Sequence, residues 1–256
     1  MEYKLTLYEK EDGIAKSTMN RPEKMNAVLR PMIYELEDQL QDFRDDKDAK
    51  VWVITGAGRG FCAGDDLDEL KKLHGEASGE IRMPRRAARV PRLLQTIDKP
   101  TIAMVNGAAV GMGFEIALAC DFIIASEKAK FGEVYIQRGT IASSGPWVLP
   151  RKVGLKNAIE ICLLGELFGA DQAQEYGLTY KITSAEELEA TTFEFAKKLA
   201  GLPSIAYQFT KHALLHGLDW DLDAELDYVA YAREIASKAG EAAKAITEFQ
   251  KTMQSR

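Results

Sequence analysis

The sequence predicts an α/β fold, in which strand and helix units repeat to about residue 195 and a helical segment follows. Two observations support this prediction. Short apolar runs rich in β-branched residues, such as residues 51–55, lead into glycine-containing turns and then into helical patterns. From residue 156 onwards the pattern is almost wholly helical. No linker separates independent domains, so we expect a core over residues 1–195 and a helical segment over residues 196–256.

The N-terminal elements follow from simple patterns. Residues 3–8 alternate, a Glu-Asp-Gly turn follows, and residues 14–19 return, which predicts a β-hairpin. Apolar side chains on one face predict a helix at about residues 30–44. Residues 51–55 form a buried strand in this interpretation. The charged segment 66–92, rich in glycine in its middle, is expected to be helical or flexible near a ligand opening.

Two further strand–turn–helix units complete the core. A strand at residues 100–105 precedes an Asn-Gly turn and a helix from about Met112 to Cys120. A third unit begins at residues 122–125. Residues 130–135 are interpreted as a short strand whose alternate residues share one face.

Bulk properties exclude several classes of protein. The chain has 256 residues, of which 46% are apolar and 28% charged, as in ordinary globular proteins. Its net charge of -6 argues against nucleic-acid binding, which needs a basic face. No signal pattern or membrane-spanning apolar stretch occurs, so we expect a cytoplasmic protein that binds no membrane. Cys62, Cys120 and Cys162 lack paired or zinc-type spacing and are expected to be reduced core residues.

Two segments have the composition needed for chemistry. Residues 61–67 read FCAGDDL and residues 111–115 read GMGFE, each after a predicted strand. Small residues let a ligand approach the main chain, and free N–H groups at a helix start favour negative charge. Two such donors aimed at one point form an oxyanion hole, in which each donor often contributes about 3–4 kcal/mol. Close packing of glycine-rich turns explains either segment alone equally well. Neither has the spacing of a dinucleotide or Walker motif.

Together these segments resemble the crotonase family of enoyl-CoA hydratases and isomerases. Residues 20–27 (NRPEKMNA) are similar to its early NRP…NA motif, and residues 61–67 to its F-x-A-G-x-D-L segment. Residues 106–121 resemble its NG…GGG..E…CD segment, and the similarity continues in register to residue 178. The resemblance implies the family's fold, which is a spiral of repeated ββα units followed by a C-terminal helical trimerisation segment.

The resemblance also implies an acyl-coenzyme A site. The thioester oxygen would lie between the backbone N–H groups of Asp65 and Met112, which do not depend on the side chains there. The coenzyme A would arrive with the substrate, and no other cofactor is implied. The further residues implied to line the site for substrate or coenzyme A are Lys24, Met25, Ala63, Asp66, Leu67, Gly111, Glu133 and Ser143, with the Asp65 side chain beside the nucleotide portion.

Glu115 is the candidate for proton transfer. It lies in the first turn of its predicted helix, where the helix dipole stabilises a carboxylate. A purely helix-stabilising glutamate is the alternative interpretation. By resemblance, this position matches one of the two glutamates that handle water in family hydratases.

The position of the second glutamate differs from the family pattern. Where those hydratases read F-G-x-x-E, residues 131–135 read FGEVY, so Tyr135 stands at the glutamate's position. Glu133 lies about 6–7 Å further back on the same predicted strand face. A tyrosine, with a pKa of about 10, normally donates a hydrogen bond and is a poor base. We therefore expect acid–base chemistry to rest on Glu115, with Tyr135 and Ser143 holding water or substrate.

Other kinds of site have no support in the sequence. His212 and His216 are four residues apart on a predicted helix but lack the remaining ligands of a zinc site, so they are expected on a helix surface, and no metal site is predicted. No G-x-S-x-G motif of a serine hydrolase occurs. The helix predicted at residues 241–251 has one apolar face, and the family resemblance implies a homotrimer or a homohexamer.

The preferred function is a lyase that adds water to a 2-enoyl-CoA, or removes it, through an enolate held at Asp65 and Met112. Tyr135 points to a specialised cyclic, aromatic or conjugated acyl group. The alternatives are a double-bond isomerase, an acyl-CoA hydrolase, a decarboxylase, and a non-catalytic acyl-CoA-binding member of the family.

Overall fold

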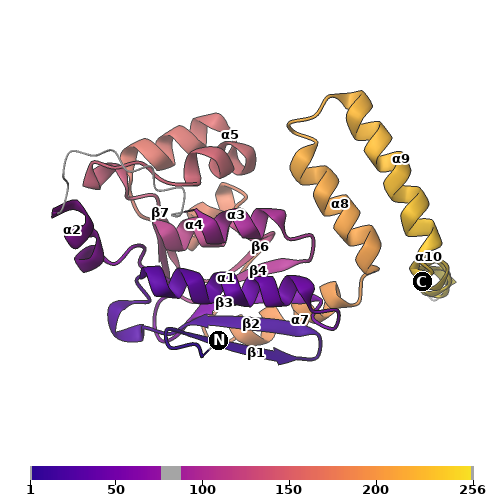
Figure 1. Cartoon of the computed structure of the whole chain (residues 1–256), viewed down its shortest axis with the longest axis horizontal. Helices are drawn as coiled ribbons and strands as arrows, with labels where there is room; N and C mark the ends of the chain where they lie inside the picture. The colour runs from indigo at the N-terminus through magenta and orange to yellow at the C-terminus, as the bar shows by residue number, and fades with distance from the viewer. Residues whose placement is uncertain (1, 76–87, 255–256) are drawn as a thin grey trace.

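The computed structural model describes residues 2–75 and 88–254 (Figure 1). The middle of the charged segment 66–92 lies outside these residues, and its expected flexibility is not addressed by the structure. A six-stranded sheet has the order β1-β2-β3-β4-β6-β9, and a three-stranded sheet has the order β5-β7-β8. The strands are β1 (Thr6–Glu11), β2 (Ile14–Met19), β3 (Val51–Gly56), β4 (Thr101–Val105), β5 (Ala108–Val110), β6 (Phe122–Ser126), β7 (Lys130–Gly132), β8 (Phe168–Gly169) and β9 (Lys181–Thr183).

The helices alternate with these strands in the core and then continue alone. They are α1 (Arg30–Asp45), α2 (Leu67–Gly75), α3 (Arg89–Thr96), α4 (Met112–Ala119), α5 (Gly145–Leu164), α6 (Ala170–Glu175), α7 (Leu188–Ala200), α8 (Ser204–His216), α9 (Leu222–Lys238) and α10 (Glu241–Gln254), with 3-10 helices η1 (Pro22–Lys24) and η2 (Ile136–Arg138). The predicted α/β class, N-terminal hairpin and α4 are therefore confirmed. None of the described helices is long and apolar enough to cross a bilayer.

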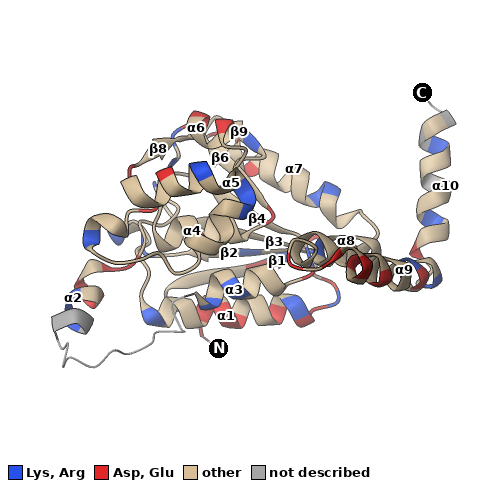
Figure 2. Ribbon diagram, turned by 90° about the horizontal axis from the view of Figure 1, so that it is seen from above, with Lys and Arg blue, Asp and Glu red and all other residues tan. Residues whose placement is uncertain are grey.

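The larger sheet is covered on both faces, which explains its uniformly apolar strands. Along β3, Trp52 and Ile54 pack into a core with α1, α3 and α4. Val51 and Val53 point the other way, into a second core with α7. Because successive side chains of a strand face opposite sides, both faces of the sheet need apolar residues. Figure 2 shows Lys and Arg interspersed with Asp and Glu along the outer helices.

Two short strands interrupt the segment predicted to be helical after residue 156. β8 pairs with β7, and β9 pairs with β6 at the edge of the larger sheet. At two and three residues, they are too short to give a strand periodicity.

The strand predicted at residues 130–135 is wrong in its second half. β7 ends at Gly132, where its parallel pairing with β5 also ends, at Val110, while its antiparallel partner β8 pairs only with residues 130 and 131. Tyr135 has φ -61° and ψ -39°, which is helical, and it precedes η2. Residues 131, 133 and 135 therefore do not share one strand face, and the 6–7 Å offset expected between Glu133 and Tyr135 does not apply.

The C-terminal helices leave the core after α7. Residue 195 lies inside α7, which packs on the sheet, so the boundary predicted there falls within a helix. In Figure 1, α8 and α9 lie side by side next to the core, and α10 follows at the end. Large apolar side chains are exposed along α8, α9 and α10: Leu214, Leu222, Leu226, Tyr231, Ile235, Ile246, Phe249 and Met253.

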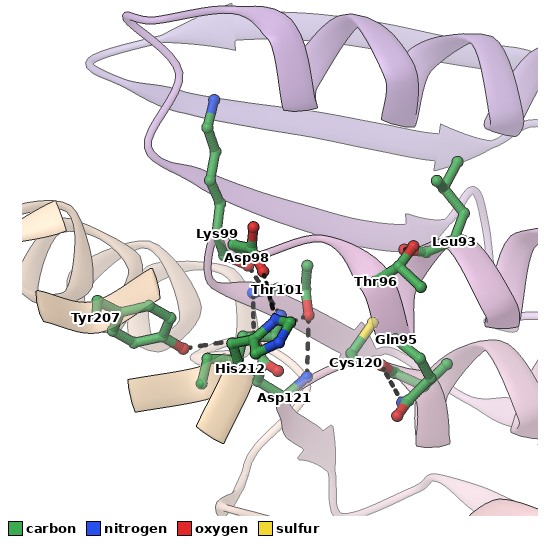
Figure 3. Close-up of polar contacts among 12 residues, drawn as sticks. Leu93, Gln95, Thr96, Asp98, Lys99, Thr101, Cys120, Asp121, Tyr207 and His212 are labelled. Atoms are coloured by element: carbon green, nitrogen blue, oxygen red, sulfur yellow. Dashed lines mark hydrogen bonds and ion pairs between the residues drawn. The ribbon is translucent and has the colours of Figure 1, made fainter. Parts of the chain in front are cut away.

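An ion pair between the buried Lys211 and the partly buried Asp121 attaches α8 to the core. Figure 3 shows Asp121 with Thr101 and Tyr207 beside it. The Lys211 Nζ donates to Asp121 Oδ2 at 2.8 Å and to the Lys99 carbonyl at 3.0 Å, and Lys211 is only 7% exposed. The same Asp121 oxygen accepts bonds from the backbone N–H and hydroxyl of Thr101, and from the Tyr207 hydroxyl at 3.4 Å. This cluster joins α8 to the end of α4 and the start of β4.

Replacing Lys211 by methionine should destabilise the protein by about 1.5–3 kcal/mol, because the partly buried Asp121 carboxylate and the Lys99 carbonyl would both lose a charged hydrogen-bond donor. Urea unfolding followed by circular dichroism measures this loss. Lys238→Met is the matched control, since Lys238 pairs with Glu234 in the open and should contribute at most about 0.5 kcal/mol. Equal losses in both variants would show that the buried pair does not hold α8.

Candidate active site

The two glycine-containing segments singled out in the sequence lie side by side. The Cys62 N–H donates to the Ala108 carbonyl at 2.8 Å, and the Val110 N–H donates to the Cys62 carbonyl at 2.9 Å. A Cβ atom on Gly113 would lie 2.3 Å from the Cys62 carbonyl oxygen, so only glycine fits there. Gly64 has φ +94°, and a Cβ atom on it would lie 2.8 Å from the Val110 carbonyl oxygen. The close approach of these segments thus depends on their glycines.

This approach places Gly64 against Val110 and Gly111, so that Asp65 and Met112 each follow directly after the contact. Met112 is the first residue of α4, so its N–H has no acceptor within the helix. Among the described residues, neither the Asp65 nor the Met112 N–H donates to another backbone carbonyl. Both N–H groups are therefore free of main-chain partners, as an oxyanion hole requires.

Glu115, on the first turns of α4, has a fully buried side chain. Its Oε1 accepts bonds from the Ser144 N–H and, at 2.7 Å, from the Gly145 N–H. Its Oε2 accepts bonds from the Ser143 hydroxyl and, at 3.4 Å, from the Tyr135 hydroxyl. These donors stabilise an ionised carboxylate in the interior.

The main-chain donors to Glu115 belong to the N-terminus of α5, which the sequence interpretation missed. That interpretation considered only the dipole of α4. The Ser-Ser-Gly-Pro sequence at residues 143–146 is nevertheless typical of a helix start, with proline in the first turn. The positive end of the α5 dipole therefore points at the Glu115 carboxylate.

Tyr135 lies beside this carboxylate, with an arginine stacked on its ring. Burial, followed by the negative charge of Glu115, raises the pKa of Tyr135, which keeps the phenol neutral. The Arg138 guanidinium lies 4.9 Å from the centre of the Tyr135 ring, and its Nη2 is 3.9 Å from Asp65 Oδ2. Burial raises the pKa of Asp65, and Arg138 opposes that rise. No motif in the sequence marked Arg138, although it follows Tyr135 by one turn of η2.

Glu133 is also buried at this place, but its carboxyl is not stabilised. Neither of its oxygens has a hydrogen-bond partner among the described residues. Burial raises the pKa of Glu133 well above its ordinary value, and the charges of Glu115 and Asp65 raise it further. Glu133 thus adds a second carboxyl to the site, in an environment opposite to that of Glu115.

The residues expected near coenzyme A differ in their exposure and in whether their side chains already have partners. Ala63 and Leu67 are exposed, and Lys24 is exposed with its Nζ 3.3 Å from Asp68 Oδ2. Met25 has a left-handed backbone (φ 51°). Asp66 is occupied, because its carboxylate accepts bonds from the N–H groups that start α2 and from Arg21 Nη2 at 3.1 Å. The Asp66 side chain therefore joins the start of α2 to Arg21.

The remaining candidates lie elsewhere or take part only in packing. His212 and His216 lie on α8, stacked with each other and with Trp220. Cys62 and Cys120 are buried, as expected of core residues, whereas Cys162 is only partly buried. Within residues 2–75 and 88–254, no group of three or more His, Cys, Asp or Glu side chains is placed to hold a metal ion.

Comparison with known proteins gives concordant matches over almost the whole chain. Residues 9–255 match the family model described as enoyl-CoA hydratase/isomerase. The 1,2-epoxyphenylacetyl-CoA isomerase of Escherichia coli (strain K12) is 33% identical over 97% of this chain and 95% of the relative. The short-chain-enoyl-CoA hydratase of Clostridium acetobutylicum is 33% identical over 91% of this chain and 89% of the relative.

Solved structures agree with these sequence matches. A putative enoyl-CoA hydratase from Streptomyces coelicolor A3(2) has a TM-score of 0.91 at 28% identity, covering 98% of this chain and 93% of the other. A putative enoyl-CoA hydratase/isomerase from Mycobacterium abscessus has a TM-score of 0.90 at 29% identity, covering 96% of each chain. The fold is therefore the one implied by the sequence resemblance.

Proposed function

The chain belongs to the enoyl-CoA hydratase/isomerase family of enzymes, and we propose that it adds water reversibly to the double bond of a 2-enoyl-CoA thioester. The observation that carries this proposal is the buried Glu115 carboxylate on α4, the helix that starts with the free N–H group of Met112. A base that can take the proton of water and donors for an oxyanion are the two requirements of the reaction.

The proposed steps use the residues around Glu115. The Glu115 carboxylate takes a proton from water, and the water oxygen bonds to C3 of the acyl group. The electron pair of the double bond moves towards the thioester, and the N–H groups of Asp65 and Met112 bind the resulting enolate oxygen. C2 then takes up the proton that Glu115 received, which completes the 3-hydroxyacyl product and regenerates the Glu115 carboxylate. Tyr135 and Ser143 donate hydrogen bonds that hold Glu115 and position the water or the acyl group.

The rest of the site would bind the thioester. Gly111 permits the main chain to turn into α4, with φ 53° and ψ -121°. Ala63 and Leu67 are exposed, so both are accessible to coenzyme A, and Lys24 would attract its phosphates. Tyr135 in place of a second glutamate favours a cyclic, aromatic or conjugated acyl group, because its ring adds apolar surface to the site.

A double-bond isomerase is the second candidate. Glu115 is the carboxylate that the site stabilises by hydrogen bonds. One carboxylate is sufficient for an isomerase, because it can take a proton from one carbon of the acyl group and return it to another. The name of the Escherichia coli relative, an isomerase acting on a coenzyme A thioester, is in keeping with this candidate.

Assays with crotonyl-CoA, a dienoyl-CoA and an aryl-substituted enoyl-CoA test the proposed function. We expect loss of the conjugated enoyl absorbance, with a 3-hydroxyacyl product identified by mass spectrometry as a gain of one water. A product of unchanged mass with a shifted double bond would favour the isomerase. Tight binding without turnover of any of these thioesters would contradict both.

We also propose that the chain assembles as a homotrimer or a homohexamer through its C-terminal helices. The exposed apolar side chains of α8, α9 and α10 support this proposal, because such a surface is normally covered. Light scattering after size-exclusion chromatography measures the assembled mass.

A further inference from the structure

The two buried glutamates of the site differ sharply in their surroundings. Glu115 accepts bonds from two N–H groups and two hydroxyl groups. Glu133 is only 1% exposed, and neither of its carboxyl oxygens has a partner among the described residues. A buried carboxylate without partners is costly, whereas its neutral form avoids most of that cost. Geometry alone therefore favours a charged Glu115 and a neutral Glu133.

These two carboxyl groups meet at the first residue of α5. The Gly145 N–H donates to Glu115 Oε1 at 2.7 Å. A Cβ atom built on the same residue would lie 2.7 Å from Glu133 Oε1. The two side chains thus lie on either side of Gly145, and the main-chain donors at the start of α5 are directed to Glu115.

The other titratable groups near Glu133 come from several elements. Asp65 and Arg138 face it from the loop after β3 and from η2, and Cys162 lies on α5. Tyr135 lies two residues along the chain, and the charge of Glu133 contributes to the rise of the Tyr135 pKa. Burial is the largest cause of the raised pKa of Glu133; Glu115 and Asp65 raise it further, and Arg138 alone lowers it. Environments that differ in this way give two carboxyl groups different protonation states at the same pH.

We propose that Glu133 is a positioning residue that sets the charge of the site: its neutral carboxyl leaves Glu115 as the charged member of the pair, and its ionisation inhibits the reaction. This inference rests on the proposed function. A second negative charge beside Gly145 would add to the negative charge already present in the buried site. It would also oppose the negative charge that develops on the enolate.

The pH dependence of kcat, measured for the wild type and for Glu133→Gln, tests this role. Glutamine is permanently neutral, so the readout is the shape of the kcat profile against pH, not the turnover at a single pH. We expect the decline of wild-type kcat on the high-pH side to be absent from the variant. Glu166→Gln is the matched control, since Glu166 is exposed and outside the site, and it should follow the wild type.

Two results would overturn the proposal. One is a Glu133→Gln profile that keeps the high-pH decline of the wild type. The other is a uniform loss of kcat with an unchanged profile, which would indicate a structural role only. Either profile is measured with whichever thioester the wild type turns over.

Urea unfolding as a function of pH gives a readout that does not need activity. Because the folded-state pKa of Glu133 is raised, its contribution to stability is present at low pH and is lost as pH rises through that pKa. The wild type should therefore lose more stability with rising pH than Glu133→Gln does. Equal slopes would overturn the proposal even in an active enzyme. Different slopes in a protein that turns over no thioester would reject the proposed function and the inhibitory role, and leave the neutral Glu133 established.

Discussion

Replacing Glu115 by glutamine is expected to lower kcat at least about 100-fold, with little change in KM, because an amide cannot accept the proton of water. The amide has one acceptor oxygen where the carboxylate has two, so it cannot satisfy all four donors around it. Steady-state kinetics with the substrate identified in the thioester assays measures the effect. Circular dichroism establishes that the variant is folded.

Tyr135→Phe provides the control for this experiment. It removes a hydroxyl that lies 3.4 Å from Glu115 Oε2 and leaves the base in place, so a much smaller loss is expected. An active Glu115→Gln enzyme together with an inactive Glu133→Gln enzyme would place the base at residue 133. That outcome would contradict both the assignment of Glu115 and the role inferred for Glu133.

Gly113→Ala is expected to lower kcat by about 100- to 1000-fold, the cost of losing one oxyanion donor. The added methyl would lie 2.3 Å from the Cys62 carbonyl oxygen and 2.7 Å from the Cys62 Cβ. A backbone oxygen cannot rotate away as a side chain can, so the start of α4 must move. That movement separates the Met112 N–H from the Asp65 N–H.

The control for this substitution is Gly201→Ala. Gly201 has φ -80°, and a Cβ atom there would have only ordinary contacts of 3.5 Å or more. This variant should keep full turnover and fold normally. Wild-type turnover in Gly113→Ala would show that the reaction does not depend on the contact between α4 and residue 62.

Helices and strands were predicted correctly from the sequence where their apolar residues follow a single clear pattern. β3 is a continuous apolar run because both of its faces are covered, and α1 has one apolar stripe because it covers a single face. Prediction was wrong after Gly132, because β7 extends only as far as its pairing with β5, which precedes it in the chain, and with β8, which follows it. Patterns within one segment carry no information about such a partner.

The site was predicted in part, for a related reason. The resemblance to the family identified Glu115, Asp65 and Met112 by their place in motifs, and the structure brings these residues together. The donors from Ser144 and Gly145 are main-chain groups, which leave no side-chain signature in a motif. The environments of Glu133 and Arg138 depend on residues from several elements, so neither their burial nor their lack of partners can be read from the sequence.

The buried pair between Lys211 and Asp121 has a consequence for catalysis as well as for stability. The helix α4 has eight residues, so it is about 12 Å long. Its first turn is wedged against Cys62, and Asp121, two residues beyond its last, is fastened to α8. The helix α4 is thus fixed at both ends, and the contact at its C-terminal end is made by α8. A mutation or a change of assembly that weakens the contact with α8 would shift the Met112 N–H. Binding of the thioester oxygen would then change, although no residue of the site had been replaced.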